Sequence, residues 1–238
     1  VKLNRWYDEI PSTVGNRNSQ INLLIQFLRL SPVTQIYVGD CEADDVIGYL
    51  VNFELNNDNV VIATSDKDYY QLITDKVKIW SPGQKKVITE DDVIQKFGTH
   101  PKNFCAARCF CGDSSDGIIG ASGVGFKSLS KRLPELSTVE ELSVADIVNH
   151  AKHRAKTSKL KLYQSIMSHE DRAKLNWKLM YLGTNNLSAD QINRVKFQID
   201  QDIPKPKKLD FMRLLNKNQI VNFDVNSYFM SVKLINKS

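Results

Sequence analysis

The stretch VVIATSDKDYYQLIT, residues 60–74, decides how this chain folds. Its first four residues are apolar, which is typical of a short strand buried inside a sheet. Two aspartates, Asp66 and Asp68, stand two positions apart where the apolar run stops. Such neighbours repel each other, because each negative charge raises the pKa of the other carboxyl. We therefore expect a cation beside them.

Strand and helix signals alternate on both sides of this stretch. Because strands joined through helices pair in parallel under helical cover, the pattern predicts an α/β fold with a mostly parallel central sheet and helices on both faces. Thr89 and Asp92 have the spacing of a capping box. The predicted strands lie at 34–39, 59–64 and 76–80, and the predicted helices at 18–30, 43–54, 67–74 and 90–97.

The pattern changes at about residue 101, after which it is almost wholly helical. The exception is GIIGASGVG at 117–125, whose four glycines favour a loop that approaches another group closely. We predict two regions: residues 1–100 hold part of the α/β core, and residues 101–238 form a helical region around the glycine loop.

Composition limits the class of protein. With 238 residues, 42% of them hydrophobic and 25% charged, the chain suits a soluble globular protein with a sizeable core. No apolar run approaches the roughly 18 to 20 residues of a membrane span, and the first residues lack the apolar centre of a secretion signal. The prediction is a cytoplasmic protein with no membrane partner. The sequence has no P-loop and no nucleophilic-serine motif, which disfavours nucleotide hydrolysis and acyl transfer.

Four cysteines are too few for a disulfide framework in a chain of this size. Three of them, Cys105, Cys109 and Cys111, lie in FCAARCFCG at 104–112. Their spacing is not that of a CxxC pair, and no nearby histidine completes a zinc site. A buried helix is the favoured interpretation, with cysteine acting as a small apolar residue.

Acidic residues gather in three segments that follow predicted strands or a helix. Each segment alone also fits a simpler interpretation, as a helix start, a capped turn or a polar loop. Ends of parallel strands meet at one edge of a sheet, so the first two segments should converge. Carboxylates without histidine or thiolate ligands favour Mg²⁺ or Mn²⁺. The three segments carry Glu42, Asp44 and Asp45; Asp66 and Asp68; and Asp113 and Asp116.

A basic run, AKHRAKTSKLK at 151–161, contains five lysines and arginines and no acid. The formal net charge of +5 is too small to identify a partner, but this separation of charges suits a protein that holds metal in one place and phosphate in another. A solvated helix face is the alternative interpretation.

Three segments in order resemble the signatures of the 5' nuclease family. They are EADDVIGYL at 42–50, VIATSDKDYYQLI at 61–73 and GDSSDGIIGASGVGFKSLSK at 112–131. The family includes the 5'-3' exonuclease domain of bacterial DNA polymerase I, phage exonucleases and ribonuclease H, and flap endonucleases. The resemblance extends over roughly residues 33–225, and it implies a PIN-like nuclease core followed by a helix-hairpin-type DNA-binding element.

The resemblance implies a structure-specific 5'-3' exonuclease or flap endonuclease that acts in replication and repair. Two Mg²⁺ ions, with Mn²⁺ as a substitute, would lie about 3.5 to 4 Å apart, activating water and stabilising the leaving oxygen. Glu42 and Asp44 would bind the tighter ion, and Asp45 and Asp116 would support the site. The second ion would be held or oriented by Asp66, Asp68 and Asp113.

The glycine loop has its own implied role in gripping duplex DNA. In the family a K⁺ ion is held there by backbone carbonyls, at positions that correspond to Phe110, Cys111, Ile119, Ala121 and Val124. The exposed N–H groups of the loop would bind phosphate at a helix start, and basic residues would continue along the backbone without reading sequence. The DNA-binding residues implied are Gly123, Val124, Gly125, Lys127, Ser128, Lys131, Arg132, Lys152, Arg154, Lys156 and Arg17, with Lys2 and Arg5 as further candidates.

The chain departs from the family pattern in two places. Gly117-Ile118-Ile119 replaces the usual Asn-Ile-Pro, which is expected to loosen that loop. The first acidic strand of the family and its arch motif have no counterpart, although Gly15-Asn16-Arg17 resembles the end of the arch motif. We therefore expect this chain to be a fragment or processed form that lacks an N-terminal segment.

The expected partner is DNA with a 5' flap, a nick or an RNA primer, cut by a monomer that works with a polymerase or a single-strand-binding protein. Ribonuclease H activity is a further possibility within the family. Two alternatives stay open at this point. One is a nuclease-fold protein that binds branched DNA without cutting it, and the other is a PIN-type ribonuclease, which lacks the glycine hairpin.

Overall fold

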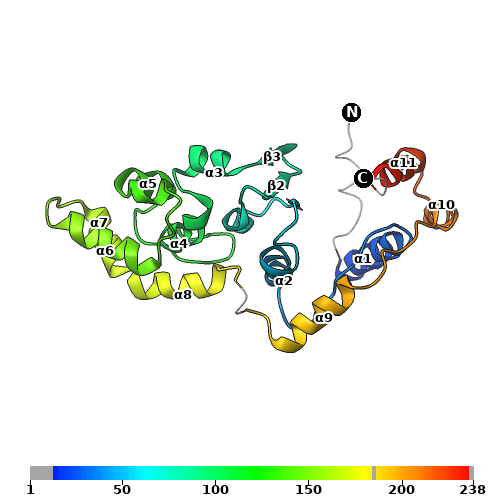
Figure 1. Cartoon of the computed structure of the whole chain (residues 1–238), viewed down its shortest axis with the longest axis horizontal. Coiled ribbons are helices and arrows are strands. Elements are labelled where there is room, and N and C mark those ends of the chain that lie inside the picture. Colours follow the sequence, from blue (N-terminus) through cyan, green and yellow to red (C-terminus); the bar gives the residue numbers. More distant parts are fainter. Residues whose placement is uncertain (1–12, 184–185, 236–238) are drawn as a thin grey trace. The chain divides into compact units, whose positions relative to one another are not determined.

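The computed structural model describes residues 13–183 and 186–235, and it divides into two compact units. One consists of residues 40–188 and the other of residues 1–39 with 189–238; each is considered separately below. Figure 1 labels the elements. In chain order they are α1 (Val14–Arg29), α2 (Ala43–Tyr49), a π-helical turn (Leu50–Glu54), β1 (Val60–Ala63), a 3₁₀ helix (Asp68–Leu72), β2 (Val77–Ser81), β3 (Lys86–Ile88), α3 (Glu90–Phe97), α4 (Pro101–Cys111), α5 (Phe126–Arg132), a second 3₁₀ helix (Pro134–Ser137), α6 (Val144–Ala155), α7 (Lys161–Ser168), α8 (Glu170–Met180), α9 (Ala189–Ile199), α10 (Lys208–Lys217) and α11 (Val225–Ile235).

The unit of residues 40–188 contains a three-stranded sheet in the order β1-β2-β3. β1 and β2 pair in parallel, with Ile62 opposite Ile79, and β3 returns antiparallel to β2. Side chains alternate along β2, where Val77 and Ile79 are buried and Lys78 is exposed. This pairing confirms the strands predicted at 59–64 and 76–80. β3 was not predicted, because three residues are too few to show a period of two.

The strand predicted at 34–39 is wrong: residues 33–38 form no ladder within the described part of the chain. Both backbone groups of Tyr37 are instead bonded to one side chain, that of Gln198 on α9. The Tyr37 N–H donates to Gln198 Oε1 over 2.8 Å, and its carbonyl accepts from Nε2 over 3.0 Å. An amide side chain thus takes the place that a neighbouring strand would fill, which the apolar pattern alone does not reveal.

The predicted helices are observed with adjusted bounds. The helix at 18–30 begins earlier, at Val14, where the Thr13 side chain accepts from the N–H of Asn16. The helix at 43–54 is α2 followed by the π-helical turn, and the short helix at 67–74 is 3₁₀. α3 starts as predicted, since the Thr89 N–H donates to the Asp92 carboxylate over 3.0 Å. None of the described helices has the length and apolar character needed to cross a bilayer.

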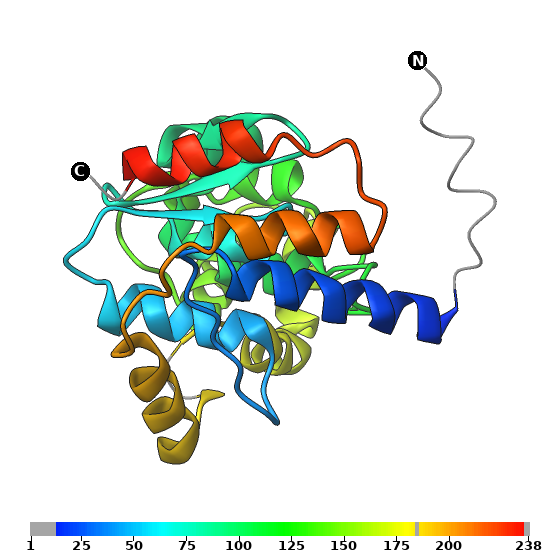
Figure 2. The same ribbon diagram turned by 90° about the vertical axis from the view of Figure 1, so that its right-hand side faces the viewer.

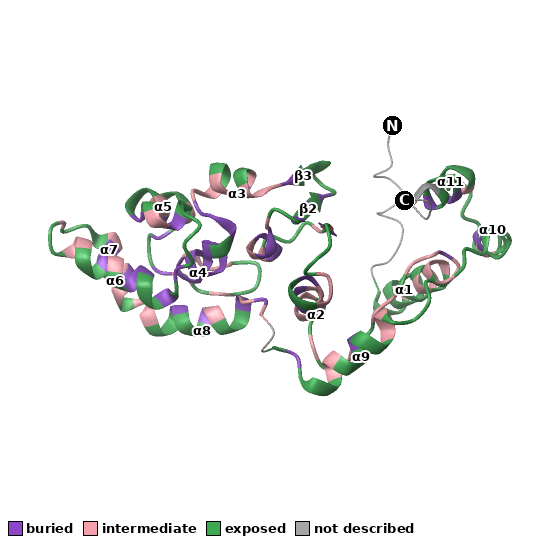
Figure 3. Ribbon diagram, viewed as in Figure 1, coloured by how far each residue is buried: buried purple, intermediate pink, exposed green. Residues whose placement is uncertain are grey.

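α4 is the central element of this unit and is buried along almost its whole length (Figure 3). Phe104 stacks on Phe126 of α5 with ring centroids 5.0 Å apart and meets Tyr70 edge to face at 5.4 Å. Cys105 and Cys109 are buried and free, which confirms the buried-helix interpretation of the cysteines. A helix that is apolar on all sides has to be surrounded, and α4 is covered by α5, α6 and α8 (Figure 1).

Asn103, also on α4, fixes the loop that leads into α6. Its buried side-chain amide donates to the carbonyl oxygens of Leu136, Thr138 and Glu140, and its oxygen accepts from the N–H of Leu142 over 2.7 Å. Four backbone groups of an irregular segment thereby find partners without a strand or helix. Buried polar groups need such partners, because an unsatisfied one costs free energy.

The unit of residues 1–39 and 189–238 has a small aromatic core where α1 and α10 lie side by side (Figure 2). Phe27 and Phe211 are in contact, with ring centroids 4.8 Å apart, and Phe229 of α11 meets Phe211 edge to face. The Lys207 N–H donates to the Leu30 carbonyl at the end of α1. Aromatic pairs of this kind contribute beyond the area they bury.

We predict that Asn103→Ala lowers the free energy of unfolding by about 2 to 4 kcal/mol, because several buried backbone groups lose their partner. Urea denaturation followed by far-UV circular dichroism measures the change. The matched control is Asn149→Ala, at an exposed position of α6, which should stay within about 0.5 kcal/mol. Equal effects of the two substitutions would contradict the role given to Asn103.

Candidate active site

Acids from the three predicted segments meet at one cavity of about 740 Å³. Glu42 is the N-cap of α2, and Asp44 and Asp45 occupy its first turn. The second segment follows β1, and the third follows α4, so the chain reaches the same place three times. Six of the seven predicted acids line this cavity: Glu42, Asp44, Asp45, Asp66, Asp68 and Asp116.

The seventh acid, Asp113, lines an adjoining cavity of about 500 Å³ that shares Asp66 and Asp116 with the first. One oxygen each of Asp68, Asp113 and Asp116 lie within 4.8 Å of one another, a separation that a single metal ion can span. Asp66 accepts from the N–H of Asp68 over 2.9 Å, which fixes the turn between them. The structure thus brings together the acids that the sequence groups in three segments.

Arg108 of α4 supplies the cation that the opening stretch requires, and the sequence analysis missed it. Arg108 is 8% exposed, and its guanidinium contacts both Asp68 and Asp113. Nε lies 2.7 Å from Asp68 Oδ1, and a terminal nitrogen is hydrogen-bonded to Asp113. The signal was present in FCAARCFCG: a single charge in an apolar helix has to be paired, because unpaired buried charges are costly.

The Asp68 carboxylate is only partly satisfied by this ion pair. Its Oδ1 is buried and has no well-directed hydrogen bond, since the nearby Nε–H of Arg108 does not point at it. An exposed carboxylate oxygen would bond to water, whereas a buried one needs a partner. Together with Asp113 and Asp116, this oxygen fits a site for a hard divalent cation, whose preferred ligands are carboxylate oxygens.

Burial and neighbouring charges shift the pKa values of Asp68 and Asp113 in opposite directions. Burial, only partly opposed by Arg108, and the acids Asp66, Asp113 and Asp116 raise the pKa of Asp68 to about 6. For Asp113 burial acts in the same direction, but hydrogen bonds from Ser115 and the charge of Arg108 outweigh it and lower the pKa. Burial and a 2.6 Å hydrogen bond to Asp44 raise the pKa of Tyr69, which therefore stays a proton donor.

The glycine loop is held between α4 and α8. The Ala121 N–H donates to the Phe110 carbonyl over 2.7 Å, and the Val124 N–H donates to that of Ala121. Asn176 of α8 donates to the carbonyls of Cys109 and Ile119, both over 2.9 Å. Gly120 packs against Cys111 so closely that a Cβ would lie 2.4 Å from its carbonyl. The five carbonyl positions implied for K⁺ therefore lie along this one loop and the end of α4.

The predicted DNA-binding residues near the glycine loop lie in the turn before α5 and on α5 itself. Gly123 is in the left-handed region, with φ of 71°, and Gly125 caps α5, where Ser128 accepts from its N–H. Val124 is buried. Lys127, Lys131 and Arg132 are exposed on α5. The three basic residues all lie on α5, which follows the turn at once.

The other predicted contacts differ from these. Lys152 lies 3.5 Å from Glu170, and Arg154 is hydrogen-bonded to Glu135 over 2.6 Å, so both are engaged by acids. Lys156 is exposed just after α6, and Arg17 is exposed on α1 in the other unit. Lys2 and Arg5 lie outside the described residues. Part of the basic run at 151–161 thus stabilises the helical region itself.

We predict that Arg108→Gln lowers the free energy of unfolding at pH 8 by about 3 to 5 kcal/mol, because it leaves buried carboxylates unpaired. The loss should shrink towards pH 5. Without Arg108 the raised pKa of Asp68 rises further, so the folded state binds a proton that the unfolded chain has released, and folding is favoured as the pH falls.

Urea denaturation at the two pH values tests this expectation. Lys102→Gln is the matched control on the same helix, where the side chain is exposed; its effect should be within about 0.5 kcal/mol at either pH. A loss for Arg108→Gln that does not depend on pH would contradict the pairing with Asp68.

The sequence is similar to those of known 5'-3' exonucleases. A family model described as the N-terminal resolvase-like domain of 5'-3' exonuclease matches residues 2–98. A 5'-3' exonuclease of Buchnera aphidicola, from Acyrthosiphon pisum, is 27% identical over 89% of this chain and 68% of its own length. The thermostable DNA polymerase I of Thermus aquaticus is 30% identical over 70% of this chain and 19% of its own length.

Solved structures resemble the fold. A bacteriophage T5 flap endonuclease, in a complex with DNA and metal ions, matches with a TM-score of 0.53 and 22% identity, over 75% of this chain and 61% of that one. A T5 5'-exonuclease matches with a TM-score of 0.51 over 74% and 67%. The chain spans 43% of a second Buchnera exonuclease, so it covers between about a fifth and two thirds of these relatives. Residues 2–98 thus match a 5'-3' exonuclease family model, and the fold resembles that of the T5 nucleases.

Proposed function

We propose that this chain carries the catalytic acids of a metal-dependent 5'-3' exonuclease or flap endonuclease that hydrolyses phosphodiester bonds. One observation carries the proposal: acids from three separate segments converge on one cavity beside a buried arginine. Such a density of carboxylates suits a pair of divalent cations better than a set of structural ion pairs, because only one buried cation lies among them in the described residues.

The acids have separate roles in this proposal. Glu42 and Asp44 hold one ion; Asp66, Asp68 and Asp113 hold or orient the other, and Asp45 and Asp116 support the site. Mg²⁺ is the expected ion, and Mn²⁺ suits the same oxygen ligands. When bound, the ions would lower the pKa of water and stabilise the leaving oxygen.

The side chains themselves prepare the site. Tyr69 donates to Asp44 over 2.6 Å and Asn186 donates to Asp45 over 2.6 Å, so each of these carboxylates keeps one fixed orientation. Arg108 contacts both Asp68 and Asp113 and so restricts the movement of these two carboxylates. Ligands fixed in advance bind with a smaller loss of entropy, which is why supporting hydrogen bonds matter as much as the ligands.

The glycine loop and α5 would grip duplex DNA as a helix-hairpin element. Phe110, Cys111, Ile119, Ala121 and Val124 would offer carbonyls to K⁺, and Gly123, Val124 and Gly125 would offer N–H groups to phosphate. Lys127, Ser128, Lys131 and Arg132 continue the contact, with Lys152, Arg154, Lys156 and Arg17 as outer contributors. In this proposal residues 1–100 serve mainly the chemistry and residues 101–238 mainly the DNA.

The proposed substrate is DNA with a 5' flap, a nick or an RNA primer, cleaved by a monomer in replication or repair. The partner reported in the T5 structure, DNA, supports this substrate class, and the polymerase relatives support a working association with a polymerase. An association with a single-strand-binding protein is part of the same proposal. Ribonuclease H activity is part of the same proposal, to be measured on an RNA–DNA hybrid. A nuclease fold that binds branched DNA without cutting is the second candidate.

We predict that Asp66→Asn with Asp68→Asn abolishes divalent-dependent release of product from a 5'-labelled flap, a loss of at least about a thousandfold in rate. The control is Asp91→Asn, an exposed acid on α3 outside the cavities, which should cut like the parent. Full-length protein is incubated with the flap and with an RNA–DNA hybrid, with and without Mg²⁺. Binding without any divalent-dependent cleavage would favour the second candidate over a nuclease.

A second prediction concerns salt. Lys131→Gln should reduce the slope of log K against log salt concentration for duplex binding by about 0.9, because one phosphate contact is lost. Lys78→Gln, exposed on β2, should leave the slope unchanged. Fluorescence anisotropy without divalent ions measures both. Equal slopes for the parent and both variants would contradict the proposal that α5 contacts DNA.

A further inference from the structure

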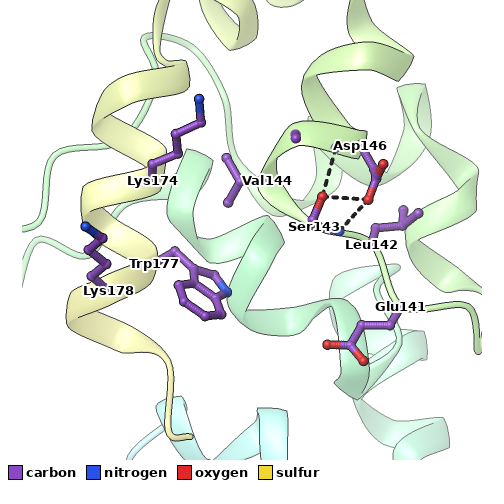
Figure 4. A pocket seen from close by; sticks show the side chains of 9 residues that line it. Glu141, Leu142, Ser143, Val144, Asp146, Lys174, Trp177 and Lys178 are labelled. Atoms are coloured by element: carbon purple, nitrogen blue, oxygen red, sulfur yellow. Dashed lines mark hydrogen bonds between the residues drawn. The ribbon is translucent and has the colours of Figure 1, made fainter. Parts of the chain in front are cut away.

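A separate cavity lies between α8 and the start of α6 (Figure 4). It encloses about 650 Å³, and its lining is formed by residues 141–146 and by the second half of α8. Trp177 projects from α8 into it, with Lys174 and Lys178 on the same helix (Figure 4). Leu142 and Val144 form an apolar wall across from the indole. The site described above does not use this cavity.

The indole of Trp177 is held in place before any ligand arrives. Tyr181 stacks on it, with ring centroids 4.3 Å apart and planes 17° from parallel. The indole is half-buried and packs against the core of the helical region, and its remaining surface lines the cavity. A fixed aromatic surface loses little entropy on binding a flat ligand, and any nucleobase can stack on it.

Lys178 connects this cavity with the acidic one, because it lines both. The other lysine, Lys174, is paired with Glu170 over 2.8 Å. Lys178 is exposed and, among the residues that the structure describes, has no carboxylate within 4.0 Å. A cation without a partner therefore stands between an aromatic platform and the acids proposed to bind metal.

We propose that this cavity binds single-stranded nucleic acid, with one base stacked on Trp177 and the adjoining phosphate at Lys178. The proposal rests on the proposed function for the kind of polymer and goes beyond it by assigning the path of an unpaired strand along α8. Glu141 and Asp146 on the opposite wall repel phosphate, so they would direct the backbone to the lysine side. The apolar walls at Leu142 and Val144 suit the faces of bases.

An apolar peptide is the other class of ligand that such a cavity could take. It would use Leu142, Val144 and Trp177 equally well, but it would not require the unpaired lysine that joins the two cavities. Phosphate requires a cation at that place, since each contact with a lysine releases counterions. The position of Lys178 therefore favours nucleic acid.

Trp177 provides its own reporter. The chain has three tryptophans, so Trp6→Phe and Trp80→Phe leave Trp177 as the fluorophore. Stacking of a base on this indole should quench its emission during titration of the whole chain with oligo-dT or oligo-rU, in EDTA to prevent cleavage. Quenching by either polymer supports the proposal, and the polymer that binds more tightly identifies the strand as DNA or RNA. No quenching by either overturns it.

Affinity measured by anisotropy gives an independent test. Trp177→Leu should weaken binding of the single strand about tenfold, because one stacked base is lost, whereas Trp177→Phe should keep most of the affinity. Lys178→Gln should reduce the salt slope by about 0.7, and Lys102→Gln, which lines neither cavity, should change nothing. Thermal unfolding checks that each variant folds. Parent-like affinity of a folded Trp177→Leu would overturn the proposal.

The flap assay separates this inference from the proposed function. Quenching of Trp177 with no divalent-dependent cleavage would support the single-strand site and contradict the proposed nuclease activity. Cleavage by the parent protein with no quenching of Trp177 would support the nuclease activity and contradict the single-strand site.

Discussion

The ion pairs of Arg108 are the constraint on which this structure depends. Arg108 is only 8% exposed, so its guanidinium has lost most of its hydration, and only carboxylates at short range replace it. Asp68 follows β1 and Asp113 follows α4, so one side chain ties the edge of the sheet to the glycine loop. Neither segment could shift alone without leaving a buried charge unpaired. The position of the acids in the cavity and the packing of α4 therefore depend on the same ion pairs.

The elements that pack around α4 hold this helix in place. Asn103 at its start donates to carbonyls of the segment that leads into α6, and Asn176 of α8 donates to the carbonyls of Cys109 in α4 and of Ile119 in the glycine loop. Buried amides thus fix the loops on both sides. Phe104 and its aromatic neighbours fill the space in between. Fully satisfied buried networks of this kind make a rigid support, and a rigid support is what metal ligands and phosphate contacts need.

Local patterns in the sequence were enough for β1, β2, α3 and the grouping of the acids, because each depends on period, capping or strand ends. They failed where partners lie far apart in the chain. Residues 34–39 look like a strand, yet the Gln198 side chain takes the backbone bonds of Tyr37. Lys152 and Arg154 look like phosphate contacts, yet Glu170 and Glu135 engage them. The sequence shows Arg108 as an isolated charge in an apolar helix, but it does not show that Asp68 and Asp113 are its partners.

Charge balance links the acids and the basic surfaces in the proposed mechanism. With its pKa raised to about 6, Asp68 is held close to protonation, and a proton and a divalent cation compete for the same oxygens. A strand of phosphates would be repelled by the cavity unless cations neutralise the carboxylates first. In the proposed function Lys178, which lines the acidic cavity, would attract the backbone, whereas the acids would repel it until metal is bound. Metal binding would therefore have to precede close approach of the scissile phosphate, and the order of binding follows from electrostatics.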